Sequence, residues 1–307
     1  MSFGGPDIKG HEWTLGFEDS KRVIDRAIDL GINFFDTADV YSDGKSEEVV
    51  GKALEGRRND VVIATKVGLP TGEGPGDRGL GEHHVRQSLG RSLTRLRTNH
   101  VDLYQIHRWD YATPVEHVLK TLTDAVRKDG FVDHIGASSM WAWQFVQALR
   151  TSDRIGLEKF VSMQNHYNLA YREEEREMIP LCIAEGVAIN PWSPLARGFL
   201  SGKYKRGAQP ETIRYRVDSL LSARYFRPED FDVAERLEEV AKEKGFKPSQ
   251  VALAWLLGKP GVTSPVVGPT SVAQLEELVS ALDVKITAED IERLEEPYRP
   301  HPVLGHR

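Results

Sequence analysis

The sequence predicts an α/β fold, and more narrowly a (β/α)8 barrel in which parallel strands are surrounded by helices. Short runs rich in Val, Ile and Phe alternate along the chain with longer segments whose apolar residues recur at helical spacing. Strict alternation of strands and helices is typical of a parallel sheet with helices outside it. Seven strands can be counted in this way, which favours a barrel over an open sheet, because open sheets more often have fewer units.

The expected strands are short, and most of them end in polar residues. They cover residues 32–35, 61–65, 101–106, 134–137, 160–163, 187–189 and 265–267. The first run stops at Asp36, the second at Lys66 and the third at His107. A buried strand that ends in an ionisable group needs a reason, because an unpaired buried charge is costly.

Helices are expected between these strands. They cover residues 19–30, 46–54, 82–97, 114–128, 142–150, 173–185, 231–244, 248–257, 271–282 and 288–294. Gly31 and Gly186 each follow a last apolar turn, where glycine commonly ends a helix. Pro114 falls in a first turn, where proline is tolerated. The segment 196–230 is too long for a plain connection, and we expect it to form a loop over a functional site.

The composition is that of an ordinary soluble protein, with 307 residues, 40% hydrophobic and 28% charged. We expect a single domain over residues 1–307. The formal net charge of -6 argues against nucleic acid as a partner, since nucleic-acid-binding surfaces are usually basic. A single cysteine, Cys182, is typical of a reducing compartment. Without a membrane-length apolar run or a signal peptide, the chain is expected to be cytoplasmic, with its oligomeric state left open.

Four polar residues at or near three strand ends are candidates for a catalytic site. Asp36, Lys66 and His107 end successive strands, and active sites of (β/α)8 barrels lie at that end. Tyr41 follows the first of them closely. The ammonium group of Lys66 would favour ionisation of the Tyr41 hydroxyl, and Asp36 can hold that ammonium in place. With His107 orienting a carbonyl, this tyrosine is suited to donate a proton as hydride reaches the carbon, which points to carbonyl reduction.

At these residues the chain resembles the aldo-keto reductases, and the resemblance covers nearly its whole length. The motifs that carry it are 31–41 (GINFFDTADVY), 64–66 (ATK), 102–107 (DLYQIH), 136–139 (GASS), 164–165 (QN), 192–198 (WSPLARG) and 201–204 (SGKY). The resemblance implies a (β/α)8 barrel, NADPH (NADP+) as cofactor and reduction of aldehydes or ketones to alcohols. It also implies a catalytic tetrad of Asp36, Tyr41, Lys66 and His107.

The resemblance assigns further residues to the cofactor. Those that correspond to contacts of the nicotinamide carboxamide are Ser138, Ser139 and Gln164. Trp192 corresponds to an aromatic residue that stacks on the nicotinamide ring. Those that correspond to the pyrophosphate loop are Ser193, Leu195, Gly198 and Lys203, and Arg214 corresponds to an arginine near the adenosine phosphate. The residues expected around the adenosine 2′-phosphate and adenine are Gly268, Thr270, Gln274 and Glu277.

The chain departs from the family pattern at a few places. Ser139 and Leu278 stand where many members have Asn, and Gln274 replaces an arginine of several NADPH-preferring members. The last change weakens the expected preference for NADPH over NADH. The first residues resemble the loop that follows the first barrel strand. We therefore expect a barrel without the usual N-terminal hairpin and first strand.

Two other functions are weighed against the enzyme. The segment 192–204 also resembles the β subunits of voltage-gated potassium channels, which bind NADPH and act as regulatory partners. The presence of His107 and the lack of an evident docking segment favour the enzyme, with a small carbonyl compound as its partner. A metal-dependent hydrolase on the same barrel would need a His-x-His pair at an early strand end, and the sequence has none there. No metal site is expected.

Overall fold

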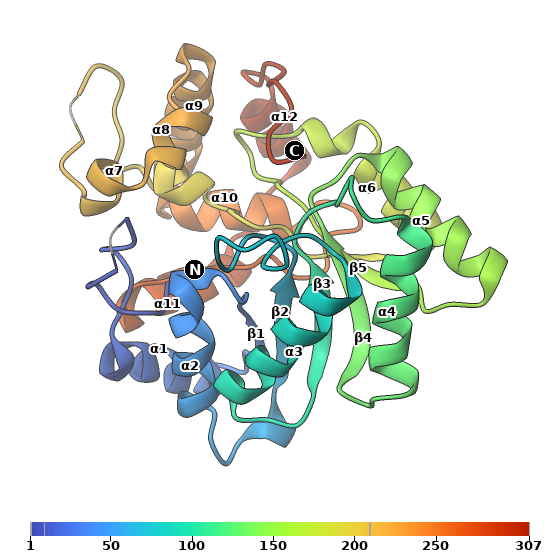
Figure 1. Ribbon diagram of the computed structural model, residues 1–307. Coiled ribbons are helices and arrows are strands. Elements are labelled where there is room, and N and C mark those ends of the chain that lie inside the picture. The colour runs from blue at the N-terminus through green and yellow to red at the C-terminus, as the bar shows by residue number, and fades with distance from the viewer. Residues whose placement is uncertain (1, 9, 209, 307) are drawn as a thin grey trace.

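A computed structural model of the protein describes residues 2–8, 10–208 and 210–306, with a parallel sheet at its centre (Figure 1). The sheet has six strands in the order β1-β2-β3-β4-β5-β6, which is their order in the chain. The strands are β1 Phe34–Asp36, β2 Val62–Val67, β3 Val101–Ile106, β4 Val132–Ser138, β5 Phe160–Gln164 and β6 Ala188–Ile189. The predicted α/β class and parallel sheet are therefore confirmed.

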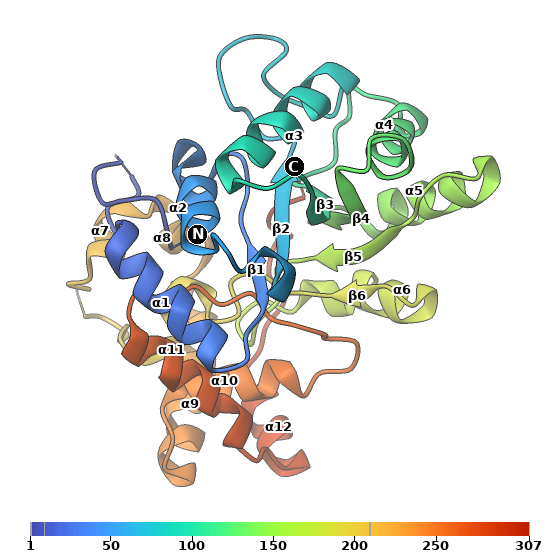
Figure 2. The ribbon, with the colours of Figure 1, turned by 90° about the horizontal axis from the view of Figure 1, so that it is seen from below.

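The helix before β1 and those that connect the strands lie outside the curl of the sheet (Figure 2). They are α1 Phe17–Asp29, α2 Lys45–Ala53, α3 Glu82–Leu96, α4 Val115–Arg127, α5 Ala142–Ile155 and α6 Met178–Glu185. Val23, Ile24 and Ala27 form the buried face of α1 at the spacing of helical turns. Gly31 then takes a left-handed backbone conformation, φ 84°, and allows the chain to turn into β1.

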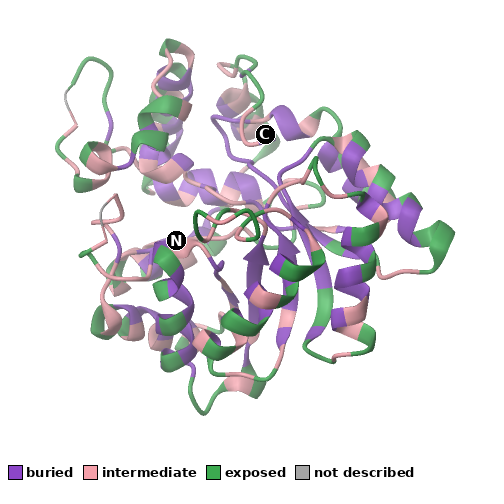
Figure 3. Ribbon diagram, viewed as in Figure 1, coloured by how far each residue is buried: buried purple, intermediate pink, exposed green. Residues whose placement is uncertain are grey.

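The last third of the chain is helical and lies on the side of the sheet between β1 and β6 (Figure 2). Its helices are α9 Pro228–Lys244, α10 Pro248–Leu257, α11 Val272–Val279 and α12 Ala288–Glu295. Helix α11 packs against α1, so part of the last third of the chain lies beside its first helix. The strands and the inner faces of the helices form the buried core (Figure 3).

The prediction of a seventh strand at 265–267 is wrong, because this segment is not a regular strand. Val266 forms only an isolated parallel bridge with Trp192, in which its amide donates to the carbonyl of Pro191 at 2.8 Å. Pro191 and Pro265 have no amide hydrogen, so a continuous ladder cannot form between these two segments. Among the described residues, the expected eight-stranded barrel is thus supported only as a curled sheet of six strands.

The long segment after β6 folds into short helices rather than one open loop. It contains a 3-10 helix at Ala196–Ser201, then α7 Ile213–Val217 and α8 Ser219–Arg224. Figure 1 shows α7 and α8 beyond the upper edge of the sheet, near the first residues of the chain. In the part of the chain that the structure describes, no helix combines the length and apolar character needed to cross a bilayer.

Candidate active site

The structure brings the four predicted tetrad residues together. The Nζ atom of Lys66 lies 2.5 Å from Oδ2 of Asp36 and donates to the carbonyl of Thr37 at 2.8 Å. The Lys66 side chain is fully buried, and that of Asp36 is 5% exposed. Burial by itself lowers the pKa of Lys66, but the charge of Asp36, with help from Tyr41, outweighs burial and raises it. Lys66 is therefore a buried, permanently charged ammonium at neutral pH.

The rings of Tyr41 and His107 are in contact beside the ion pair of Lys66 and Asp36. Their ring centroids lie 5.6 Å apart in an edge-on arrangement, and Nζ of Lys66 lies 4.9 Å from the centroid of the tyrosine ring. Burial lowers the pKa of His107 well below its usual range, and the charges of Lys66 and Arg108 lower it further. His107 is thus a neutral imidazole, whose N–H can donate a hydrogen bond to a carbonyl oxygen without protonating it.

The backbone around Tyr41 is strained. Tyr41 begins a short 3-10 segment, Tyr41–Gly44, in which Ser42 and Asp43 have φ values of 51° and 53°. Residues with side chains rarely adopt this left-handed region, and such strain persists only where neighbouring structure holds it. Here the Ser42 hydroxyl donates to the carbonyl of Phe3 at 3.3 Å, which fixes the segment against the start of the chain.

Two glutamine side chains hold the second oxygen of Asp36. Nε2 of Gln164 donates to Oδ1 at 2.8 Å, and Nε2 of Gln105 donates to the same atom at 3.1 Å. Sequence reasoning missed Gln105 in this role. The signal was present, because residues two apart in a strand point to the same face, and Gln105 lies two residues before His107.

The residues expected around the nicotinamide carboxamide lie at the same strand ends, where they bond to one another. The Ser138 hydroxyl donates to the backbone carbonyl of Gln164 at 2.8 Å. The Ser139 hydroxyl accepts a hydrogen bond from the indole nitrogen of Trp192 at 2.8 Å. The structure therefore places Ser138, Ser139, Gln164 and Trp192 beside the tetrad in one hydrogen-bonded group.

Both faces of the Trp192 indole are in contact with other side chains. His166 stacks on it with ring centroids 4.1 Å apart, and Tyr171 stacks on the far side of His166 at 4.0 Å. The guanidinium carbons of Arg224 and Arg108 lie 4.9 Å and 5.8 Å from the centroid of the same indole. Because His166 covers one face, these cations take up the other. Sequence reasoning did not single out His166, Arg108 or Arg224.

The expected pyrophosphate loop turns sharply after β6. Ser193 and Gly198 have φ values of 54° and 95°, and Leu195 packs against the core. Lys203 is exposed on the far side of this turn. Arg197 pairs with Asp218 at 2.6 Å, and Arg214 pairs with the same carboxylate at 3.1 Å.

The remaining predicted cofactor residues lie at the start of α11. The amide of Thr270 donates to Oε1 of Gln274 at 2.9 Å, and a Cβ atom on Gly268 would lie 2.6 Å from the Ser2 hydroxyl. Glu277 bonds to Lys247 at 2.7 Å and to Ser249 at 2.5 Å. Burial raises the pKa of Glu277, but these hydrogen bonds and the charges of Lys247 and Lys203 lower it overall. The charge of Lys203 thus acts on Glu277, although the chain separates them widely.

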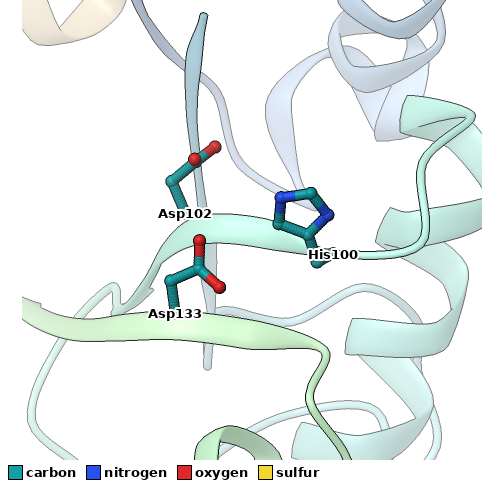
Figure 4. A group of neighbouring side chains, drawn as sticks. All are labelled: His100, Asp102 and Asp133. Carbon is teal, nitrogen blue, oxygen red and sulfur yellow. The ribbon is translucent and has the colours of Figure 1, made fainter. Parts of the chain in front are cut away.

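One group of potential metal ligands lies outside this region. His100, Asp102 and Asp133 turn toward one another at the opposite, amino ends of β3 and β4, with ligand atoms within 4.8 Å (Figure 4). Asp102 is already paired with Arg58 at 2.7 Å and accepts the amide of Ile63 at 2.8 Å. These bonds give Asp102 a structural role, and the group lies at the end of the sheet away from the tetrad.

Comparison with known proteins agrees with this geometry. The sequence model of the Aldo/keto reductase family matches residues 1–299. The chain is 41% identical to the versiconal hemiacetal acetate reductase of Aspergillus parasiticus, over 99% of this chain and 93% of that protein. It is 38% identical to the aldo-keto reductase AMT2 of Alternaria alternata, over 100% of this chain and 88% of that protein. It is also 38% identical to the aldo-keto reductase dtxS3 of Metarhizium robertsii, over 96% of this chain and 85% of that protein.

A family match over nearly the whole chain coincides with the assembly of an aspartate, a tyrosine, a lysine and a histidine at three neighbouring strand ends. The relatives named above are reductases, which fits a site built for carbonyl reduction. The chain therefore belongs to the aldo/keto reductase family and is an oxidoreductase.

Proposed function

We propose that this protein reduces aldehydes or ketones to alcohols with NADPH, and that Tyr41 donates the proton. The observation that carries this proposal is the fully buried ammonium of Lys66, held at 2.5 Å by Asp36 and at 4.9 Å from the centre of the Tyr41 ring. A buried cation beside a phenol stabilises the phenolate that remains when the proton leaves. An ion pair at this depth is costly to bury, which is consistent with a functional role.

Each tetrad residue then has a distinct task. When bound, the nicotinamide supplies hydride to the carbonyl carbon. Tyr41 transfers its proton to the carbonyl oxygen, and Lys66 stabilises the resulting phenolate. Asp36 fixes Lys66 by direct contact, and His107, a neutral imidazole, orients the carbonyl oxygen.

The charges around Trp192 fit a cofactor that carries phosphates. Arg197 and Arg214 share one carboxylate, Asp218, so their combined charge is only half compensated. We infer that Arg214 and Lys203 contact the phosphates, and that the predicted residues at the start of α11 bind the adenosine end. Stacking of the nicotinamide on Trp192 requires Arg224 to leave the indole, since His166 covers the other face.

The choice of NADPH over NADH rests on positive charge. Lys203 and Arg214 both follow β6 in the chain, and the charge of Lys203 acts on Glu277 of α11, near which a 2′-phosphate would add two negative charges. Gln274 offers no compensating charge, and its amide oxygen is occupied by Thr270. We therefore expect both cofactors to bind, with NADPH preferred.

Exposed aromatic side chains near the strand ends support an aromatic carbonyl compound as substrate. Trp143 is 57% exposed and lies 6.4 Å, between ring centroids, from Trp109, which follows β3. Tyr111 is 66% exposed two residues further on. Large exposed aromatic groups around a site can stack on a flat substrate. A single domain over residues 1–307, a cytoplasmic location and a small molecule as the partner are parts of the same proposal.

The regulatory-subunit alternative differs in a measurable way. A sensor would bind NADPH without turnover, whereas the enzyme should consume it in the presence of benzaldehyde. The complete tetrad favours turnover, since a binding protein has no need of a buried lysine beside a tyrosine.

The test is NADPH oxidation, followed by absorbance, with benzaldehyde and with the Tyr41→Phe variant. We expect wild-type turnover and a loss of 10²-fold or more in kcat for the variant, the usual range for a positioned proton donor. NADPH binding, followed by tryptophan fluorescence, should be unchanged. Turnover by the variant equal to that of wild type would remove Tyr41 from the proposal, and binding without any turnover would favour the regulatory alternative.

A further inference from the structure

Arg108 is fixed at the edge of the tetrad. It follows His107 directly, and its Nη1 atom donates to the backbone carbonyl of His107 at 2.5 Å. The same atom lies 3.4 Å from the Ser138 hydroxyl. The guanidinium group extends over Trp192, with its carbon 5.8 Å from the indole centroid. Its position is therefore set by a backbone carbonyl and a hydroxyl group rather than by a carboxylate.

The charge of Arg108 is not compensated within the described part of the chain. No ion pair there joins a carboxylate to Arg108 or to its neighbour Arg224. Arg172, which is also largely buried, has two such partners, Glu175 at 2.8 Å and Glu295 at 2.6 Å. Burying a cation without a partner is costly.

Arg108 nevertheless stays charged at neutral pH. Burial lowers its pKa to about 10, and the nearby charge of Arg224 acts in the same direction while Tyr41 opposes it. Two guanidinium groups thus lie over one indole with no acid between them. This arrangement leaves a positive site beside the reacting tyrosine.

The second terminal nitrogen of Arg108, Nη2, lies beside the last described residues of the chain. A Cβ atom placed on Gly305 would lie 3.6 Å from the Trp192 ring and 4.0 Å from Nη2 of Arg108. Residue 305 therefore lies close to both the indole and Nη2. An anionic group that enters there would meet a guanidinium whose Nη2 has no hydrogen bond to the described residues.

We propose that Arg108 binds an acidic group of the substrate, so that the enzyme prefers carbonyl compounds that carry a carboxylate or an ionised phenol. This inference rests on the proposed carbonyl reduction at Tyr41. The planar guanidinium offers two parallel N–H donors, which suit a carboxylate. Charge-assisted hydrogen bonds of this kind give roughly tenfold to hundredfold discrimination over a neutral analogue.

A cofactor phosphate is the other source of negative charge. Arg108 is anchored to His107 and Ser138, at the end of the site where the carbonyl reacts. The cations proposed for the phosphates, Lys203 and Arg214, lie on the segment that follows β6. The location of Arg108 therefore favours the substrate as the source.

The experiment compares matched aldehydes at saturating NADPH. The pair is 4-carboxybenzaldehyde and its methyl ester, methyl 4-formylbenzoate, with the 3-substituted isomers as a second pair. We expect wild-type kcat/KM to favour the acid by about tenfold or more. The difference should appear mainly in KM, because the contact is made in both the ground state and the transition state.

Three variants assign the preference to the residue. Arg108→Gln should abolish the preference for the acid, and Arg108→Lys, which keeps the charge, should retain part of it. Arg91→Gln, on the exposed face of α3, is the matched control and should change nothing. Should Arg108→Gln fail to fold, as judged by circular dichroism, Arg108→Met, which keeps a long side chain without its charge, takes its place and should also abolish the preference.

The outcomes separate this inference from the proposed function. Turnover of both aldehydes with no preference for the acid, or an equal preference in Arg108→Gln, overturns the role of Arg108. A loss of NADPH affinity by the same factor in Arg108→Gln would show that the anion belongs to the cofactor. If neither aldehyde is turned over, the proposed function fails. Calorimetric binding of 4-carboxybenzaldehyde, weakened in Arg108→Gln, would then still support the anion site, and unchanged binding would overturn it.

Discussion

Asp39 is a second carboxyl group buried beside the tetrad, between Asp36 and Tyr41 in the chain. It is 3% exposed, and its pKa is raised from 3.8 to about 7. Burial is the main cause, and the nearby carboxylate of Glu47 adds to it, whereas Arg95 acts in the opposite direction. At neutral pH this residue therefore titrates in the folded protein, unlike an ordinary aspartate.

This shift predicts a loss of stability as pH rises. In the unfolded chain Asp39 loses its proton near pH 4, whereas in the folded chain it keeps the proton up to about pH 7. The unfolded state therefore binds fewer protons in this window, and the free energy of unfolding falls with rising pH. Between pH 5 and 8 the loss from this one group is about 3 kcal/mol.

The Asp39→Asn variant, which does not titrate, should lack this loss. Urea unfolding at pH 5 and pH 8 measures the difference, with the exposed Asp29→Asn as control. The variant should gain stability relative to wild type on going to pH 8. Parallel pH dependence in the two proteins would disprove the assignment.

At the scale of elements, the packing of α2 against α3 depends on one glycine. A Cβ atom on Gly51 would lie 2.5 Å from backbone atoms of Leu96 and 2.6 Å from the carbonyl of Arg95. These are backbone atoms that cannot rotate away. The two helices can approach this closely only because residue 51 has no side chain.

Gly51→Ala should therefore destabilise the protein by about 1–3 kcal/mol, since it forces the helices apart. Gly90→Ala, in α3, is the matched control, because nothing lies within 4 Å of its Cβ position. That change should stabilise by about 0.5–1 kcal/mol, the usual gain of alanine over glycine in a helix. Chemical denaturation measures both, and effects of the same sign would contradict the close contact.

Hydrogen bonds to Glu173 and Tyr171 hold the end of the chain, residues 298–305, near the site. Glu173 accepts the Tyr298 hydroxyl at 2.6 Å and the amide of His301 at 2.8 Å. The amide of Leu304 donates to the Tyr171 hydroxyl at 2.9 Å. These bonds place Gly305 beside Trp192 and so limit the entrance.

Glu173→Ala should release this segment. The amide of His301 and the hydroxyl of Tyr298 lose their acceptor, so hydrogen exchange at His301 should become about tenfold faster or more, and KM for benzaldehyde should rise. Arg176→Ala removes only an exposed partner of Glu173 and should have little effect. Unchanged exchange in Glu173→Ala would mean that other contacts hold the segment.

At the scale of the whole molecule, the proposed cofactor residues come from both halves of the chain. Ser138 and Gln164 lie on β4 and β5, Arg214 lies on α7, and Gln274 lies on α11. A ligand that contacts all of them links the sheet to the helices of the last third. It can do so only when the molecule is folded.

NADPH should therefore raise the melting temperature. At a hundred times its Kd it adds about 2.7 kcal/mol to the free energy of unfolding, which corresponds to a rise of roughly 5 °C for a protein of this size. Thermal unfolding followed by circular dichroism measures the shift, with NADH expected to give a smaller one. No shift with either cofactor would contradict the proposed site.

Much of this architecture follows from local sequence. The alternation of apolar runs predicted six of the strands, and the glycine at position 31 predicted the end of the first helix, because these signals depend on neighbouring residues alone. The approach of Asp36, Lys66 and His107 also followed from sequence, since parallel strands align their carboxyl ends at one edge.

Other features were decided only by tertiary structure. The expected strand at 265–267 reduced to a bridge because Pro191 of the neighbouring segment offers it no amide hydrogen, and neither segment alone reveals that the two are paired. The hydrogen bond from Gln105 to Asp36, the contacts of Arg108 and Arg224 with Trp192, and the raised pKa of Asp39 join residues distant in sequence or depend on burial. The sequence by itself predicted the family, which the comparisons confirm, and the four residues that the fold brings together, whereas the charge balance around the site depended on which groups the fold buries together.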